Sequence, residues 1–307
     1  MIGLRCAIAT GLLLVSVAAK PRAQDGPVIA AGAPVTVARA ARYDMTSRLN
    51  GQQYRVFVSM PYGADPAKKY PVVYVLEGNI YFALASEILT RQSLQTIPAT
   101  MAQAIVVGIG YPTDDPDVVN QRRGFDLTAT DSDGNRTRGQ EGGGGEAYLS
   151  MIEDQVKPLV ANHYPVDSSR QILYGHSVGG ALALRSLFKN PTAFSTYVLS
   201  SPSIFIDNRE VLKWEQAFSE RAKAGQLHLQ ILVTSAGDEQ YRGTDPTLLK
   251  AAQTNRMIDN ATELAQRLAA LSPGNISVTR TVFEGEVHAS VPPSSLTRGL
   301  RFALPPQ

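Results

Sequence analysis

The stretch QILYGHSVGGALALRSLF, residues 171–188, decides the fold of this chain. Its first residues, QILY, favour a β-strand, whereas residues 181–188 are rich in Ala and Leu and favour a helix. The periodicity changes within GHSVG, residues 175–179. The stretch therefore predicts a strand, an abrupt turn and a helix, with Ser177 on the turn.

The turn has the pattern G-x-S-x-G of a nucleophile elbow. In that motif the serine backbone is strained so that the hydroxyl stands clear of the sheet, and flanking glycines leave room for the neighbouring strand and helix. The backbone N–H of Val178 then lies at a helix N-terminus, where an oxyanion is stabilised. A glycine-rich turn capped by serine is the alternative. The strand before Ser177, the helix after it and Gly180 favour the catalytic interpretation.

The N-terminus is set apart from the rest of the chain. Residues 7–19 form an apolar run after Arg5, too short to span a membrane and followed at once by Lys20, Pro21 and Arg22. We expect residues 1–23 to be a secretory signal peptide, cleaved after Ala19 or Ala23, and the protein to be periplasmic or secreted. Residues 24–34 are expected to be a flexible tether. Residues 35–307 are then long enough for a single domain with one sizeable core.

Charge and cysteine content exclude several classes of function. Cleavage after Ala23 leaves 26 of the 29 basic residues against 27 acidic ones. A nearly neutral protein gives no support for binding nucleic acid or an anionic membrane. The single cysteine, Cys6, lies in the predicted signal peptide. The mature chain therefore has no disulfide, no cysteine nucleophile and no thiolate metal site, and we expect neither a metal nor an organic cofactor.

The rest of the chain alternates between strand and helix patterns. Residues 70–78 and 104–111 are continuous apolar runs typical of buried parallel strands, and a helix is expected between them at residues 80–95. Two earlier strand patterns are joined by Asn50-Gly51, a strong hairpin signal. Further strands are expected at residues 196–203, 227–237 and 275–285, and further helices at residues 146–164, 208–224, 248–271 and 294–304. This alternation predicts an α/β fold with a mostly parallel central sheet and helices on both faces.

Residues 112–145 interrupt this rhythm. The segment is polar, contains Asp114-Asp115-Pro116 and Arg122-Arg123, and ends in four glycines at residues 142–145. We expect a long loop insert without secondary structure of its own, with its glycine-rich end at the mouth of the site.

A serine nucleophile needs a base, and the chain has only four histidines. His176 lies inside the elbow and should point away from the Ser177 hydroxyl. His163 precedes the serine, and His228 sits in a strand pattern; for both we favour a structural role. His288 follows the last strand, at the edge where ligand-facing loops of an α/β sheet gather, and is the predicted base.

The acid that orients the base should lie between Ser177 and His288 at the end of a strand. Glu239 and Asp238 are the candidates, Asp207 is a weaker one, and a Ser–His dyad without a close acid stays open. A second oxyanion donor is expected after the strand at residues 70–76, where the backbone N–H of Asn79 is favoured over a plain strand-ending turn.

These motifs resemble the putative-esterase branch of the α/β-hydrolases, which includes esterase D, the mycolyltransferases and the enterobactin esterases. The resemblance is carried by YPVVYVLEGNIYF from Tyr70, Arg123 with Asp126-Leu127-Thr128, HYPVD, LYGHSVGG, LSSPSIF from Leu199 and EGEVHASVPP from Glu284. It implies Ser177 as nucleophile, His288 as base and Asn79 with Val178 as oxyanion donors. Two departures concern the acid: Glu77 stands where Asp is commoner, and Asp238-Glu239 does not copy the family's acid motif.

Within that branch the chain looks most like the periplasmic siderophore esterases, which cleave the ester bonds of a catecholate trilactone. The resemblance implies that Arg122 or Arg123 faces an anionic iron chelate; a solvated arginine pair is the alternative. The expected function is a serine carboxylester hydrolase that acts on a small-molecule ester through an acyl-enzyme. An acyltransferase with the same site, or a non-catalytic periplasmic ligand-binding protein on the same fold, are the alternatives.

Overall fold

The strand, turn and helix predicted from residues 171–188 are present in the computed structural model. The model describes residues 35–94, 100–129, 142–241, 243–271 and 275–306. Strand β5 (Val166–His176) leads through Ser177 into helix α6 (Val178–Lys189). The predicted signal peptide and tether, residues 1–34, lie outside the described residues, as do residues 130–141 of the expected loop insert.

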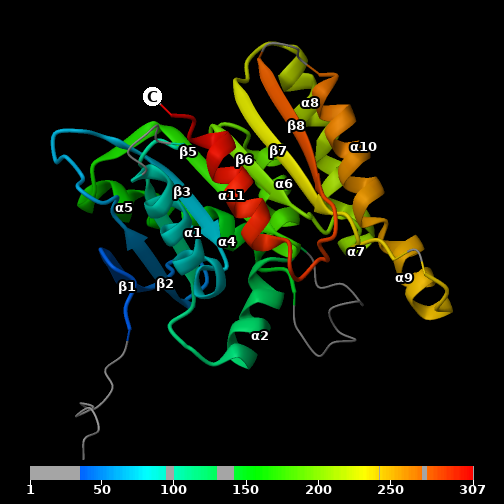
Figure 1. The fold of residues 1–307 in the computed structure, drawn as a ribbon, viewed down its shortest axis with the longest axis horizontal. Coiled ribbons are helices and arrows are strands. Elements are labelled where there is room, and N and C mark those ends of the chain that lie inside the picture. The colour runs from blue at the N-terminus through cyan, green and yellow to red at the C-terminus, as the bar shows by residue number, and fades with distance from the viewer. Residues whose placement is uncertain (1–34, 95–99, 130–141, 242, 272–274, 307) are drawn as a thin grey trace, which may run out of the picture. The chain divides into compact units, whose positions relative to one another are not determined.

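The described residues form one eight-stranded sheet with the strand order β1-β2-β4-β3-β5-β6-β7-β8 (Figure 1). The other strands are β1 (Ala40–Thr46), β2 (Gln53–Ser59), β3 (Tyr70–Leu76), β4 (Ile105–Gly110), β6 (Thr196–Ser200), β7 (Leu229–Ala236) and β8 (Ile276–Phe283). Strand β2 is antiparallel to β1 and to β4, and every other pair in the sheet is parallel. The predicted α/β class with a mostly parallel sheet is confirmed.

The predicted hairpin joins β1 to β2. Thr46 pairs with Gln53, so the connection contains Asn50-Gly51. Gly51 has a φ of +70°, in the left-handed region that a residue without a Cβ adopts at little cost. The hairpin supplies the antiparallel edge of an otherwise parallel sheet.

Helices cover both faces of the sheet. They are α1 (Gly78–Ser93), α2 (Pro116–Asp126), α4 (Gly145–Met151), η1 (Ile152–Val156), α5 (Lys157–His163), α7 (Ile206–Arg209), η2 (Glu210–Trp214), α8 (Glu215–Lys223), α9 (Pro246–Asn255), α10 (Met257–Ala269) and α11 (Pro292–Ala303). In Figure 1, α1 and α11 lie side by side over one face. No helix in the described part of the chain is long and apolar enough to cross a membrane.

The core has two layers because successive side chains of each strand point to opposite faces. In β3, Val73 and Val75 belong to the cluster that packs under α1 and α11, with Phe82 and Leu296 among its members. Tyr74, by contrast, belongs to the larger cluster on the other face, together with residues of α6, α8 and α10. Burial on both faces explains why this strand is a continuous apolar run rather than an alternating one.

The prediction of a loop without secondary structure at residues 112–145 is wrong for the first half of that segment, because residues 116–126 form α2. The Asp115 carboxylate accepts a hydrogen bond from the backbone N–H of Asp117 at 2.9 Å, and Pro116 occupies the first turn. Asp followed by Pro is a helix N-cap followed by a first-turn residue that needs no N–H partner. The polar composition concealed this helix, of whose residues only Val119 and Asp126 are buried.

Three helix predictions differ from the structure in continuity. Residues 248–271 form two helices, α9 and α10, separated at Arg256, whose φ of 44° is left-handed. Residues 208–224 are divided among α7, η2 and α8. Residues 146–164 contain the π-helical turn η1 directly before Pro158, whose ring and missing N–H are incompatible with a regular α-helix at that point.

Candidate active site

Ser177 occupies a strained turn between β5 and α6. Its φ of 58° and ψ of −121° are unfavourable for a residue with a side chain, and its N–H donates to the Ser200 carbonyl of β6 at 2.9 Å. A Cβ on Gly175 would lie 2.2 Å from the Gly179 carbonyl oxygen, and one on Gly180 would lie 2.9 Å from the Ser200 oxygen. The glycines therefore permit the close approach that lifts the Ser177 hydroxyl off the end of the strand.

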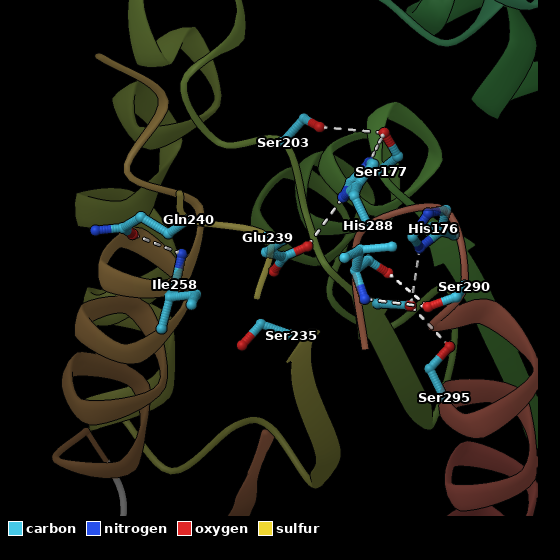
Figure 2. A network of polar contacts seen from close by, with 12 residues as sticks. His176, Ser177, Ser203, Ser235, Glu239, Gln240, Ile258, His288, Ser290 and Ser295 are labelled. Atoms are coloured by element: carbon cyan, nitrogen blue, oxygen red, sulfur yellow. Dashed lines mark hydrogen bonds and ion pairs between the residues drawn. The ribbon is translucent and has the colours of Figure 1, made fainter. Parts of the chain in front are cut away.

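His288 and Glu239 complete a line of polar contacts with Ser177 (Figure 2). His288 Nε2 lies 2.9 Å from Ser177 Oγ, and His288 Nδ1 lies 2.9 Å from Glu239 Oε2. The Glu239 side chain is fully buried, whereas 40 % of the His288 side chain is exposed. Glu239 follows β7 and His288 follows β8, so the parallel strand direction brings both to the edge of the sheet where β5 delivers Ser177.

The structure distinguishes the three acid candidates by position. Glu239 contacts His288, whereas Asp238 is exposed and its backbone N–H donates to the Glu286 carbonyl at 2.9 Å. Asp207 lies in α7 and lines a cleft that Val178 also lines. The carboxylate next to the imidazole is therefore that of Glu239.

The turn after β3 is built for a close approach to β4. Glu77 has a φ of 60° and precedes α1, and a Cβ on Gly78 would lie 2.7 Å from the backbone of Gly108. The Asn79 side chain fixes this turn: its Nδ2 donates to the Tyr111 carbonyl at 3.0 Å, and its Oδ1 accepts from the Tyr111 N–H at 2.7 Å. The backbone N–H groups of Asn79 and Val178 belong to the first turns of α1 and α6, where N–H groups have no partner within the helix.

Glu77 and Arg123 form a buried ion pair behind this turn. The Glu77 carboxylate is only 2 % exposed and accepts a hydrogen bond from Arg123 Nε. Burial raises the pKa of Glu77, and the adjacent Arg123 charge opposes that increase. The pair ties α2 to the turn that carries Asn79, and 27 % of the Arg123 side chain remains exposed.

Arg122 has different contacts. Its guanidinium lies over the rings of Tyr54 and Tyr111, at 5.0 and 4.7 Å from their centroids, and pairs with Asp126 at 3.5 Å. These contacts hold α2 against the sheet. Of the two predicted arginines, the structure brings Arg123 to the turn after β3 and gives Arg122 a packing role.

Ser203 is a neighbour of Ser177 that the sequence analysis did not single out. Its Oγ lies 3.3 Å from Ser177 Oγ, and its N–H donates to the Ser177 carbonyl at 3.0 Å. It lines a cleft of about 30 Å³ that also contacts Val178 and Ile206. Its place at the end of LSSPS, as the last residue of the strand predicted at residues 196–203, was the available signal.

Two of the remaining histidines lie away from this line. His163 is exposed on α5, where Nδ1 lies 2.8 Å from the Leu159 carbonyl. His228 is exposed directly before β7, at the strand end opposite Glu239. Within the described ranges, no cluster of three or more His, Cys, Asp or Glu residues is arranged to hold a metal ion.

Comparisons with known proteins identify the family of this chain. The family model described as "Putative esterase" matches residues 46–272. The chain is 35% identical over 266 residues to the ferri-bacillibactin esterase BesA of Bacillus subtilis, an alignment that covers 85% of this chain and 88% of that protein. It is 34% identical over 264 residues to the siderophore triacetylfusarinine C esterase of Aspergillus fumigatus, covering 81% of this chain and 88% of that protein.

A solved structure gives the same result in three dimensions. The crystal structure of the BES protein from Bacillus cereus superposes with a TM-score of 0.78 at 30% identity, covering 90% of this chain and 99% of that one. From sequence, fold and site geometry together, the chain belongs to the Putative esterase family of the α/β-hydrolases and is a carboxylic ester hydrolase.

Proposed function

We propose that this protein hydrolyses the ester bonds of a siderophore through an acyl-enzyme on Ser177. The observation that carries the proposal is the line Ser177–His288–Glu239, in which one imidazole contacts both a serine hydroxyl and a buried carboxylate at 2.9 Å. This arrangement activates a serine for acyl transfer. The substrate class rests on the relatives named above, which are esterases of ferri-bacillibactin and triacetylfusarinine C.

The first half of the reaction forms the acyl-enzyme. Ser177 Oγ attacks the ester carbonyl carbon while His288 Nε2 takes the hydroxyl proton. The carbonyl oxygen becomes an oxyanion, which the N–H groups of Asn79 and Val178 stabilise. The intermediate collapses as the bond to the alcohol breaks, and His288 returns the proton to the leaving alkoxide.

The second half repeats these steps with water. His288 takes a proton from a water molecule that attacks the acyl carbon, and the collapse of the second intermediate restores Ser177 and releases the acid. Glu239 accepts a hydrogen bond from Nδ1–H, which keeps the basic lone pair on Nε2, and it stabilises the imidazolium that forms in each half. Because the Glu239 carboxylate is buried, water does not screen its interaction with His288.

Arg123 is the proposed contact for substrate charge. A ferric catecholate chelate carries negative charge, and a guanidinium attracts anionic oxygens both by charge and by its fixed set of donors. Arg123 is held by Glu77 at the turn that carries Asn79, and part of its side chain reaches solvent. A chelate whose ester carbonyl lies at Ser177 is therefore within the field of this cation.

Export from the cytoplasm is proposed on the sequence alone. Residues 7–19 form an apolar run behind Arg5, and small residues precede the two predicted cleavage positions. An exported esterase of this kind acts on chelates before or as they enter the cell.

The proposed function predicts that Ser177→Ala abolishes hydrolysis. The wild type should convert a ferric catecholate trilactone to its linear acids, measured by mass spectrometry, and should gain one fluorophosphonate adduct. The variant should give neither product nor adduct, because no other hydroxyl is activated by His288. Ser277→Ala, which changes an exposed serine on β8, is the matched control and should behave as the wild type. Product formation by Ser177→Ala would contradict the assignment.

Glu239→Gln should lower kcat by roughly a thousandfold, because an amide can donate to Nδ1 and thereby select the wrong imidazole tautomer. Asp238→Asn, one residue away, should stay within about twofold of the wild type, since an exposed carboxylate makes no contact that catalysis uses. Steady-state kinetics of both variants measure this difference. Full activity of Glu239→Gln would instead support a Ser–His dyad.

The role of Arg123 predicts a salt effect that depends on substrate charge. KM for a ferric chelate should rise as NaCl is increased, because ions screen exposed charges over about 8 Å at physiological ionic strength. KM for a neutral p-nitrophenyl ester should not change. Arg123→Gln, whose amide can still donate to Glu77, should remove the salt effect, and Arg122→Gln should keep it. An equal salt effect on both substrates would argue against Arg123.

Export predicts that the protein isolated from its own cells begins at Lys20 or at Gln24. The intact mass of the protein from periplasmic or secreted material should therefore lack residues 1–19 or 1–23. A mass that retains Met1 in the exported fraction would contradict the predicted signal peptide.

A further inference from the structure

His176, the second residue of GHSVG, contacts the proposed base. It ends β5 and is buried to 4 % exposure. Its ring centroid lies 4.8 Å from that of His288, with 36° between the ring planes, so the two imidazoles face each other. Tyr81 of α1 meets the His176 ring edge-on at 6.1 Å. Figure 2 shows His176 next to His288, on a different side from Glu239.

A chain of buried hydroxyl groups holds the His176 ring in place. His176 Nδ1 lies 3.0 Å from Ser200 Oγ, which donates to Ser295 Oγ at 2.8 Å. Ser295 Oγ lies 2.9 Å from the Tyr174 hydroxyl. The chain joins β5 and β6 to α11, the helix that follows the His288 loop. These contacts therefore fix the His176 ring relative to β6 and α11.

His176 is uncharged at neutral pH. Burial lowers its pKa to about 3, and the charges of His288 and Arg123 act in the same direction, whereas hydrogen bonds with the backbones of His288 and Ser200 act against it. The titratable groups around it are Tyr81 from α1, Arg123 from α2, Tyr174 from its own strand and His288 from the loop before α11. His288 itself faces Glu239, and the Glu77 carboxylate interacts with its charge.

We propose that His176 is a positioning residue, an uncharged platform against which the His288 ring is held so that Nε2 meets Ser177 and Nδ1 meets Glu239. The inference rests on the proposed catalytic role of His288. Two hydrogen bonds alone leave a 40 % exposed imidazole free to rock about the line that joins them. A fixed aromatic face removes that freedom, and it also attracts the positive charge that His288 acquires during the reaction. A positively charged His176 would instead repel the His288 imidazolium.

The test compares His176→Leu with His176→Phe by the rate of fluorophosphonate labelling of Ser177. His176→Leu removes the aromatic face and should slow labelling by roughly tenfold or more. His176→Phe keeps an uncharged aromatic face and should retain most of the labelling rate. His228→Leu, which removes an exposed histidine before β7, should match the wild type.

Labelling by the wild type separates this inference from the proposed function. If the wild type formed no adduct, the result would count against an activated Ser177. If the wild type formed the adduct and His176→Leu were labelled equally fast, the proposed positioning role of His176 would be overturned. Equal impairment of the Phe and Leu variants, both with wild-type melting temperatures, would also overturn it.

A measurement on the unchanged protein does not depend on how the variants fold. Only four histidines are present, so their ring Hε1 signals can be followed by proton NMR. One signal should stay constant from pH 5 to 8 and should be the one missing from His176→Phe. Titration of His176 in that range would place a charge beside the imidazolium and would overturn the proposal.

Discussion

The close approach of the chain to itself at Ser177 is the constraint on which the rest of the site depends. Without side chains at Gly175 and Gly180, α6 can begin within van der Waals contact of the strand that precedes it and of β6. The cost is a serine backbone at φ 58°, which the hydrogen bond to the Ser200 carbonyl helps to maintain. This backbone conformation places the Ser177 hydroxyl at the end of a central strand, next to the backbone N–H of Val178.

Parallel strands turn this local feature into a site. Strands β3, β5, β7 and β8 all end at the same end of the sheet, so the turn with Asn79, Ser177, Glu239 and His288 converge, although 111 residues separate Ser177 from His288 in the sequence. Of these four strands, β3, β5 and β7 are hydrogen-bonded to a neighbour on both sides, whereas β8 is an outer strand with one neighbour. The His288 loop follows that edge strand, and the buried hydroxyl chain through Ser200 and Ser295 gives the following helix a second attachment.

Buried charge near Ser177 is arranged in groups of opposite sign. Glu77 is matched by Arg123, and Glu239 faces the imidazole of His288. Farther along the cleft, buried Arg185 pairs with both Glu146 and Glu210. Removing one member of such a group leaves an uncompensated buried charge, which is costly. These ion pairs therefore also link parts of the fold. The Glu77–Arg123 pair links the turn after β3 to α2, and Arg185 links α6 to α4 and η2.

The sequence alone determined the α/β class, the parallel direction of the buried strands, the hairpin at Asn50-Gly51, and the elbow at Ser177, because these depend on periodicity and on residues adjacent along the chain. His288 also followed from the sequence, because only four histidines had to be placed. The tertiary structure decided what depends on distance across the fold. It set Glu239 rather than its neighbour Asp238 against His288, separated Arg123 from Arg122 by one helical step, formed α2 in a polar segment, and stacked His176 on His288. Adjacent residues on a turn or helix point in different directions, and only packing against the sheet selects which of them meets the site.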